Sequence, residues 1–239
     1  PGARLESEVP SYLGAEISKM TNANEVFGAL AQGYSRWGDV LAQSHVSSGP
    51  AMADVLDKLI SLEIVQKRAP INDPTNKRKS GYFVVDPLSL FYYRYVFRNG
   101  SSRQLLDPEV FYDRHVAQDF EENYVPHMFE EICRQYLVRQ NRSGMVEPAF
   151  DAIGKYWYDG PVNKTSGEFD VVTQDPDGYT FYEAKFRKSP ITQKMIDEEI
   201  AQVEATELKC HRYGFFSRSG FETDRDGKTV LIDLPQMFE

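Results

Sequence analysis

A turn in the second half of the chain constrains the fold most. The tetrapeptide Asp-Pro-Asp-Gly at 175–178 lies between two runs rich in strand-forming residues, FDVVTQ before it and YTFYEAKF after it. Pro presets turn angles, and Asp and Gly tolerate the remaining ones, so this combination is typical of a tight turn. We therefore predict an antiparallel hairpin over 167–189. Helical patterns on both sides of it indicate an α/β domain.

The register of this hairpin determines where its charged residues lie. A loop of two or four residues places Asp170 opposite Glu183 and Glu168 opposite Lys185, whereas a three-residue loop shifts the pairing by one. With the first register, alternation along the strands puts all four side chains on one face. The other face would then carry Val171, Tyr182, Ala184 and Phe186.

Two acids and a lysine clustered on one face of the hairpin have two explanations. Carboxylates opposite each other destabilise a sheet, and burial increases the cost because each ion loses hydration. Mg²⁺ or Mn²⁺ between Asp170 and Glu183 would remove that cost and could also hold a phosphate oxygen. Lys185 would then orient or deprotonate an attacking water, or stabilise negative charge. In the alternative, Glu168 and Lys185 form an ordinary ion pair and the acids are simply hydrated.

The first hundred residues predict a different kind of domain. Apolar spacing favours helices over about 22–32, 35–43 and 48–62, and the last has Pro50 near its first turn. Two strand-like runs follow, on either side of the polar loop NDPTNKRKSG. Three helices and a hairpin are the pattern of a winged helix. The aromatic run LSLFYYRYVFRNG at 88–100 is predicted to be a packing helix.

Nucleic-acid contact would come from the loop of this predicted winged helix. Lys77, Arg78 and Lys79 at its tip could touch phosphates, whereas the third helix carries Asp54 and Asp57 and suits a major groove poorly. The alternative is a solvated loop on a docking module.

Charge and composition limit the classes of function. The formal net charge is −9, and nearly all of the acidic excess lies after residue 100. A bulk nucleic-acid binder is therefore excluded, whereas metal ions or simple solubility would both suit the acidic part. Apolar runs are too short to cross a membrane, and the first residues do not form a signal peptide. Two cysteines suggest a reducing compartment, so we expect a cytoplasmic protein.

The hairpin motif resembles the PD-(D/E)XK nuclease superfamily. Its FD at 169–170 and EAK at 183–185 match an Asp on one strand and Glu-x-Lys on the next. The resemblance implies that Asp170 and Glu183 bind the metal and that Lys185 is catalytic. An upstream helix often adds a Glu, and FEE at 129–131 suggests Glu130 as the auxiliary ligand. The family's helix motif often has Gly four residues before its Glu, and in this chain Pro126 stands there.

The order of motifs resembles the C-terminal region of a group of bacterial and archaeal AAA-like P-loop ATPases. Matching stretches include ALAQGYSRWGDVL, GYFVVDPLSLFYYRYV, FEEICRQYL, YEAKFR and YGFFSRSGF. The resemblance implies a winged helix followed by a nuclease-like domain of uncertain function. No G-x-x-x-x-G-K-[ST] occurs, so ATP would bind only to an ATPase domain preceding residue 1, a partner within the same protein. The first residue, Pro, also suggests a fragment.

We thus expect a winged-helix domain followed by a restriction-endonuclease-like α/β domain with a mixed central sheet. The expected boundaries are 1–19 for a connecting segment, 20–98 for the winged helix, 99–119 for a packing linker and 120–239 for the nuclease-like domain. The predicted function is metal-dependent hydrolysis of nucleic acid, with DNA favoured. The alternatives are a non-catalytic binding or regulatory module of the ATPase, and a winged-helix transcription regulator.

Some polar residues are weaker candidates. Arg218 could meet a phosphate beside Ser217, although a surface turn explains both, and Gln193 and Lys194 could assist the lysine strand. Cys210 and His211 are adjacent but have no partners at zinc-site spacing. Buried thiols are the preferred explanation for Cys133 and Cys210.

Overall fold

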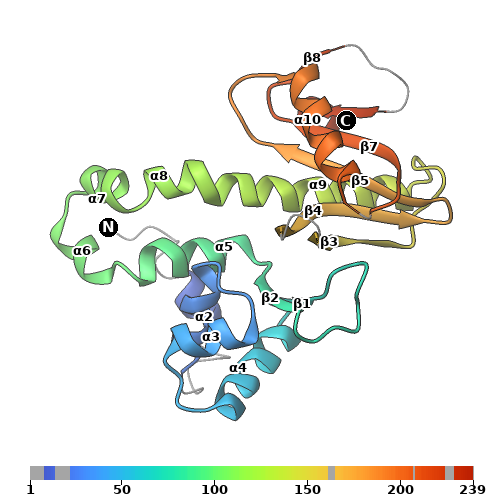
Figure 1. Ribbon diagram of the computed structural model, residues 1–239. Coiled ribbons are helices and arrows are strands. Elements are labelled where there is room, and N and C mark those ends of the chain that lie inside the picture. Colours follow the sequence, from blue (N-terminus) through green and yellow to red (C-terminus); the bar gives the residue numbers. More distant parts are fainter. Residues whose placement is uncertain (1–7, 14–21, 161–164, 207, 224–228, 239) are drawn as a thin grey trace. The chain divides into compact units, whose positions relative to one another are not determined.

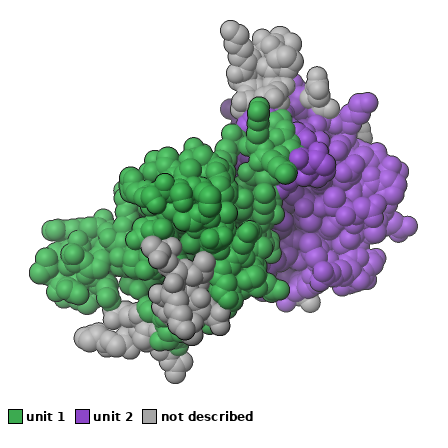
Figure 2. Space-filling view, turned by 90° about the horizontal axis from the view of Figure 1, so that it is seen from below, with its two compact units in different colours: residues 1–68, 76–120 green, residues 69–75, 121–239 purple. Residues whose placement is uncertain are grey.

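The computed structural model describes residues 8–13, 22–160, 165–206, 208–223 and 229–238. The predicted connecting segment 1–19 therefore lies largely outside the described residues. The chain divides into two compact units, which Figure 2 distinguishes by colour. Unit 1 comprises residues 1–68 and 76–120, and unit 2 comprises 69–75 and 121–239. Within the described ranges, no helix has both the length and the apolar character that a membrane span requires.

Unit 1 contains, after the helical residues 8–13, three helices and a pair of strands (Figure 1). The helices are α2 (Ala23–Ala31), α3 (Trp37–Ser44) and α4 (Gly49–Ser61), and the antiparallel strands are β1 (Val65–Arg68) and β2 (Gly81–Val84). Helix α4 starts where the Ser48 side chain accepts a hydrogen bond from Ala51 N, with Pro50 in the first turn. The predicted helices and hairpin are confirmed, with boundaries shifted by one or two residues.

The aromatic run continues unit 1 as α5 (Pro87–Phe91) and the π-helix η1 (Tyr92–Phe97), which confirms its helical prediction. Tyr93 is buried, stacks on Phe27 with ring centroids 4.1 Å apart, and donates a hydrogen bond to Asn24 Oδ1. The segment expected to be a linker is helical: it forms α6 (Gly100–Leu105), α7 (Pro108–His115) and α8 (Ala117–Asp119). The contacts of Tyr93 with Phe27 and Asn24 explain why the run is aromatic: it packs against α2.

Unit 2 contains a mixed five-stranded sheet, as predicted. Its strand order is β3-β4-β5-β7-β9, antiparallel from β3 to β5 and parallel from β5 to β9. The strands are β3 (Ala152–Gly160), β4 (Thr165–Asp175), β5 (Gly178–Lys185), β7 (Cys210–Ser217) and β9 (Thr229–Asp233). The unit also contains η2 (Phe120–Tyr124), α9 (Val125–Arg142), β6 (Ile191–Thr192), α10 (Gln193–Glu204), β8 (Phe221–Glu222) and η3 (Pro235–Phe238).

The two faces of this sheet have separate apolar cores. One core joins Phe129 and Cys133 of α9 to Tyr182 of β5, and the other joins Val203 of α10 to Phe181 of β5. Neighbouring residues of β5 thus point to opposite faces, as the pleat requires. The predicted apolar face of the hairpin is confirmed, because all its members belong to the α9 core: Val171, Tyr182, Ala184 and Phe186.

The outer edge of β3 is covered by residues from the loop that follows β1. Ile71 N donates a hydrogen bond to Lys155 O at 2.7 Å. The Asn72 side chain donates to Trp157 O at 2.7 Å and accepts from Trp157 N at 3.1 Å. The loop satisfies backbone groups that an open sheet edge would leave unpaired. This is why residues 69–75 belong to unit 2.

Two glycine substitutions test the packing. A Cβ at Gly214 would lie 2.3 Å from the ring of the buried Tyr182, whereas a Cβ at Gly28, inside α2, meets nothing within 4 Å. We expect Gly214→Ala to lower the free energy of unfolding by about 1–3 kcal/mol, because a packed ring must shift. Gly28→Ala should raise it by about 0.5–1 kcal/mol, because Ala favours helix. Urea denaturation measures both, and equal effects would contradict this packing.

Candidate functional site

Of the two registers that the sequence left open, the β4–β5 hairpin has the one expected for a loop of two or four residues. The paired residues run from Val171 with Tyr182 to Asp175 with Gly178, which leaves a two-residue loop. Asp175 Oδ1 accepts hydrogen bonds from Asp177 N at 2.8 Å and Gly178 N at 3.2 Å, and Gly178 has φ +135°. The turn therefore depends on an Asp side chain and on glycine. Asp170 and Glu183 stand one residue beyond the Val171–Tyr182 pair, at the end of the ladder away from the turn.

A β-bulge lies at Asp170. Strand β3 pairs Gly154 with Val172 but Tyr156 with Phe169, so β4 has one residue more than β3 over this interval. Phe169 and Val172 consequently belong to the same core although they are three residues apart. Bulges interrupt alternation and redirect side chains, and they are frequent beside active sites. The bulge places an acid of the predicted motif at a bend in the sheet.

The bulge corrects one detail of the expected arrangement. Glu168 was expected to face Lys185, but its ion-pair partner is Lys155 of β3, with 2.7 Å between Nζ and Oε1. Lys155 Nζ is also 2.7 Å from Asp170 Oδ1. The extra residue between Glu168 and Val172 explains the difference, because simple alternation from Glu183 and Lys185 no longer reaches Glu168. Lys155 was not identified from the sequence.

Lys155 remains a cation in this arrangement. Burial by itself lowers the pKa of Lys155, but the carboxylates of Asp170 and Glu168 outweigh burial and raise it. The side chains of Asp170 and Glu168 are 44% and 45% exposed, so water still reaches both acids. Lys155 therefore offsets part of the repulsion between the acids without excluding solvent from Asp170.

Lys185 is likewise held by two acids. Its Nζ is 2.6 Å from Glu183 Oε1 and 2.7 Å from Glu199 Oε1. Burial alone lowers the pKa of Lys185, but the two carboxylates outweigh burial and raise it. Glu199 comes from α10, where the sequence offers three consecutive acids, and only the phase of the helix shows which of them reaches the sheet.

Glu183 is the most perturbed acid of this group. Burial raises its pKa to about 7; Lys185 acts in the opposite direction, and the charges of Glu199 and Asp170 add to the rise. Asp170 is thus close enough for its charge to be felt at Glu183. A carboxyl with a pKa near 7 shares its proton with water at neutral pH, a property typical of functional sites. The structure therefore places Glu183 and Lys185 in direct contact, whereas the ion pair of Asp170 is with Lys155 and only its charge acts on Glu183.

Glu130 lies elsewhere. It belongs to α9, where its carboxylate is 3.7 Å from His127 Nδ1. Helix α9 packs on the sheet face that carries Tyr182 and Ala184, whereas alternation along β5 directs Glu183 to the other face. Among the described residues, no hydrogen bond or ion pair joins Glu130 to Asp170 or Glu183.

The protein supplies only some of the ligands that a small hard cation needs. The described residues contain no group of three or more His, Cys, Asp or Glu arranged to hold a metal. Asp170 and Glu183 supply two carboxylates, and Mg²⁺ is commonly bound by one or two carboxylates with waters and phosphate oxygens. The two acids therefore fit Mg²⁺ or Mn²⁺ by ligand type and number.

The weaker candidates have structural partners. The Arg218 guanidinium lies over the Phe186 ring at 4.6 Å, and the buried Ser217 Oγ donates to Gly220 O at 2.7 Å. Gln193 donates to Asp197 Oδ1, and Lys194 pairs with Glu198 at 3.7 Å. None of these contacts involves Asp170, Glu183 or Lys185.

The loop lysines and the cysteines differ in exposure. Lys77 and Arg78 are exposed and Lys79 is half-buried, so the tip of the loop remains accessible. Cys133 is buried and Cys210 half-buried, and both are free thiols. Burial raises the pKa of Cys210 to about 11, which keeps it protonated.

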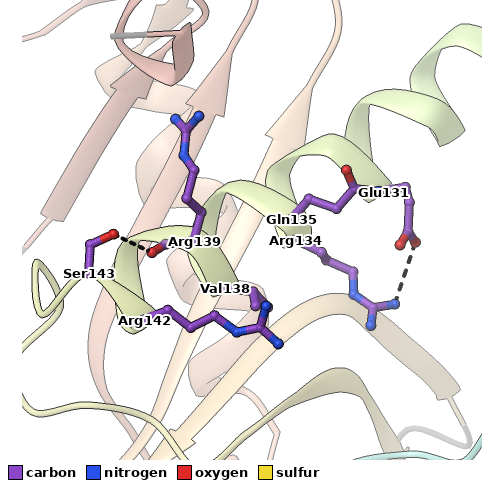
Figure 3. A pocket seen from close by; sticks show the side chains of 7 residues that line it. All are labelled: Glu131, Arg134, Gln135, Val138, Arg139, Arg142 and Ser143. Atoms are coloured by element: carbon purple, nitrogen blue, oxygen red, sulfur yellow. Dashed lines mark hydrogen bonds and ion pairs between the residues drawn. The ribbon is translucent and has the colours of Figure 1, made fainter.

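A hollow of about 400 Å³ on the surface of α9 was not expected from the sequence (Figure 3). Two of its arginines are engaged: Arg134 pairs with Glu131 at 3.7 Å, and Arg139 donates to Met237 O at 2.7 Å. Its lining comprises Glu131, Arg134, Gln135, Val138, Arg139, Arg142 and Ser143. The acids and lysines of the β4–β5 hairpin are not part of it.

Comparisons with known proteins give a family match for part of the chain. Residues 92–203 match DUF234, described as archaeal and bacterial proteins of unknown function. The chain is 25% identical over 159 residues to "Uncharacterized protein MJECL04" of Methanocaldococcus jannaschii. That match covers 65% of this chain and 34% of the relative, so the chain spans about a third of the relative's length.

Two solved structures give weak matches. A mutant of ZitR from Lactococcus lactis is 13% identical with a TM-score of 0.28, covering 56% of this chain and 99% of ZitR. Protein VC1899 from Vibrio cholerae is 9% identical with a TM-score of 0.28, covering 98% of this chain and 53% of VC1899. Scores this low support no argument about fold or function.

The raised pKa of Glu183 predicts a dependence of stability on pH. Between pH 4.5, the ordinary pKa of this carboxyl, and about 7, its folded-state value, the folded protein keeps a proton that the unfolded chain has lost. Stability therefore falls as pH rises through this window. In Glu183→Gln the free energy of unfolding should fall by about 1–3 kcal/mol less over the same pH range than it does in the wild-type protein. Urea denaturation at pH 5 and pH 8 measures it, and identical pH profiles would refute a perturbed Glu183.

Proposed function

We propose that this chain carries a metal-dependent nuclease site in a restriction-endonuclease-like domain, formed by Asp170, Glu183 and Lys185. The observation that carries the proposal is the contact of Lys185 with Glu183, whose Nζ and Oε1 are 2.6 Å apart; the charge of Asp170 on the neighbouring strand β4 adds to the raised pKa of Glu183. Acids brought together in a partly buried site favour a cation. Hydrolysis of a phosphodiester is the reaction that such a cation and an adjacent ammonium suit best.

Asp170 and Glu183 would hold Mg²⁺ or Mn²⁺, with Glu130 as an auxiliary ligand only if α9 or its side chains rearrange. The bound ion would polarise a phosphoryl oxygen and lower the pKa of a bound water. Because its ion-pair partners raise its pKa, Lys185 is protonated at neutral pH and cannot act as the base. Its ammonium would instead donate hydrogen bonds to a phosphate oxygen or orient the attacking water.

Glu199 has a positioning role in this proposal. Its carboxylate holds Lys185 from the side of α10, at 2.7 Å. If Asp170 and Glu183 held a cation, Glu183 would attract Lys185 less, and Glu199 would keep the ammonium of Lys185 in place. Lys155 would likewise have a positioning role, because its Nζ holds the carboxylate of Asp170 at 2.7 Å.

The substrate would be nucleic acid, with DNA favoured. The proposed winged helix of unit 1 would contribute phosphate contacts through Lys77, Arg78 and Lys79 at the loop tip. Because the chain spans 34% of its archaeal relative, an ATPase domain elsewhere in the whole protein is also part of this proposal, and ATP would bind only there.

A non-catalytic role is the second candidate. Lys155 and Lys185 each pair with two of the four acids and offset part of their charge, which is also what a purely structural ion-pair network would do. The domain would then be a scaffold that binds nucleic acid or the ATPase partner. Nucleic-acid binding that is insensitive to Mg²⁺, without cleavage, would favour this role.

Asp170 and Glu168 provide a matched test. Both bind Lys155 Nζ at 2.7 Å and both are similarly exposed, but only Asp170 is a proposed metal ligand. We expect Asp170→Asn to reduce Mn²⁺-dependent cleavage of DNA at least 100-fold, because a ligand is lost. Glu168→Gln should change it by less than about threefold, as a solvent-exposed ion pair contributes little. The assay uses linear, circular and single-stranded DNA and RNA, with EDTA as the blank.

Three results are decisive. Loss in Asp170→Asn with activity retained in Glu168→Gln locates the site. Equal activity in both variants would overturn the assignment of Asp170. Absence of cleavage by the wild-type chain, repeated with the whole protein and ATP, would leave the non-catalytic role.

A further inference from the structure

Unit 1 contains a second polar hollow, of about 450 Å³, which is independent of the hairpin site. It is lined by the end of α2, by η1 and the residues after it, by the end of α7 and by α8. No aliphatic side chain lines it, and three of its lining residues are arginines: Arg94, Arg98 and Arg114. An apolar ligand is therefore excluded.

Arg94 is fixed in place. It donates from Nε and Nη2 to the two oxygens of Asp119 at 2.6 and 2.8 Å, and from Nη1 to Ala31 O at 3.2 Å. Tyr95 OH also donates to Asp119, at 2.7 Å. The carboxylate that lines the hollow is thus fully occupied, and it does not compete with an incoming anion for the remaining donors.

Arg98 and Arg114 differ from Arg94 in their exposure and in their partners. Both are exposed, and among the described residues neither guanidinium has a hydrogen-bond acceptor or an acidic partner. With Arg94 and Asp119, they leave the lining with a formal charge of +2 when His115 is neutral.

The remaining lining supplies further donors. The side chains of Tyr34, Asn99 and His115 all carry groups that can donate hydrogen bonds. Guanidinium groups match phosphate in charge and in geometry, since two parallel N–H donors meet two oxygens. The volume lies within the range of small-molecule sites.

We propose that this hollow binds a phosphate group, carried either by a small molecule such as a nucleotide or by a nucleic-acid backbone. Arg98 and Arg114 contact the phosphate. Arg94, which Asp119 holds in place, lines the hollow and adds positive charge. The proposal goes beyond the nuclease function, because it concerns unit 1 and shares no residue with the β4–β5 hairpin.

The experiment uses the whole chain in EDTA at low salt, so that no divalent cation acts at Asp170 and Glu183. Calorimetry measures the affinity for inorganic pyrophosphate, and fluorescence anisotropy measures the affinity for a short labelled single-stranded DNA. The variants are Arg98→Ala and Arg114→Ala, both at exposed positions where folding is unaffected. Lys209→Ala, which removes one exposed charge in unit 2, is the control.

We expect each arginine variant to bind pyrophosphate about tenfold more weakly than wild type, as the loss of a charge-assisted hydrogen bond requires. Lys209→Ala should bind as wild type does. If DNA affinity falls in parallel, the phosphate belongs to a nucleic-acid backbone; if only pyrophosphate affinity falls, it belongs to a small molecule. Wild-type protein that binds neither probe, or arginine variants that bind both as tightly as wild type, would overturn the proposal.

Discussion

The pairing of β4 with β5 positions every group of the proposed site. Asp175 and Gly178 close a two-residue loop, and this loop length sets which residues face each other along the two strands. A shift of one residue would turn Glu183 and Lys185 towards the α9 core and bring Tyr182 out of it. The buried Tyr182, packed against Gly214 of β7, opposes that shift. The apolar core on one face thereby holds Glu183 and Lys185 on the other.

Electrostatics explains why this polar group can exist inside the fold. Four carboxylates close together would repel, and each of two lysines is shared between two of them. The compensation is incomplete at Glu183, whose pKa rises to about 7 because burial outweighs Lys185. Such a residual cost is what a bound cation would remove.

Much of this arrangement follows from the sequence. The turn residues predicted the hairpin and limited its register to two possibilities, and the alternation of Tyr182 and Ala184 predicted the apolar face. Glu199 and Lys155 were missed. The contact of Glu199 depends on which side of α10 faces the sheet, and the contact of Lys155 depends on the pairing of β3 with β4, which the sequence does not show. The bulge at Asp170 left no local signal, so the expected Glu168–Lys185 pair was wrong. The position of Glu130 was predicted by resemblance alone, and packing of α9 on the other sheet face separates it from Glu183.

The most direct measurement is Mn²⁺ binding to the whole chain, followed by electron paramagnetic resonance at pH 6 and pH 8. If Asp170 and Glu183 form a cation site, wild-type protein binds Mn²⁺, and more tightly at pH 8 because the proton on Glu183 no longer competes. Binding should disappear in Glu183→Gln and persist in Glu168→Gln. Mn²⁺ binding that is equal in both variants, or independent of pH, would contradict a cation site at these two acids.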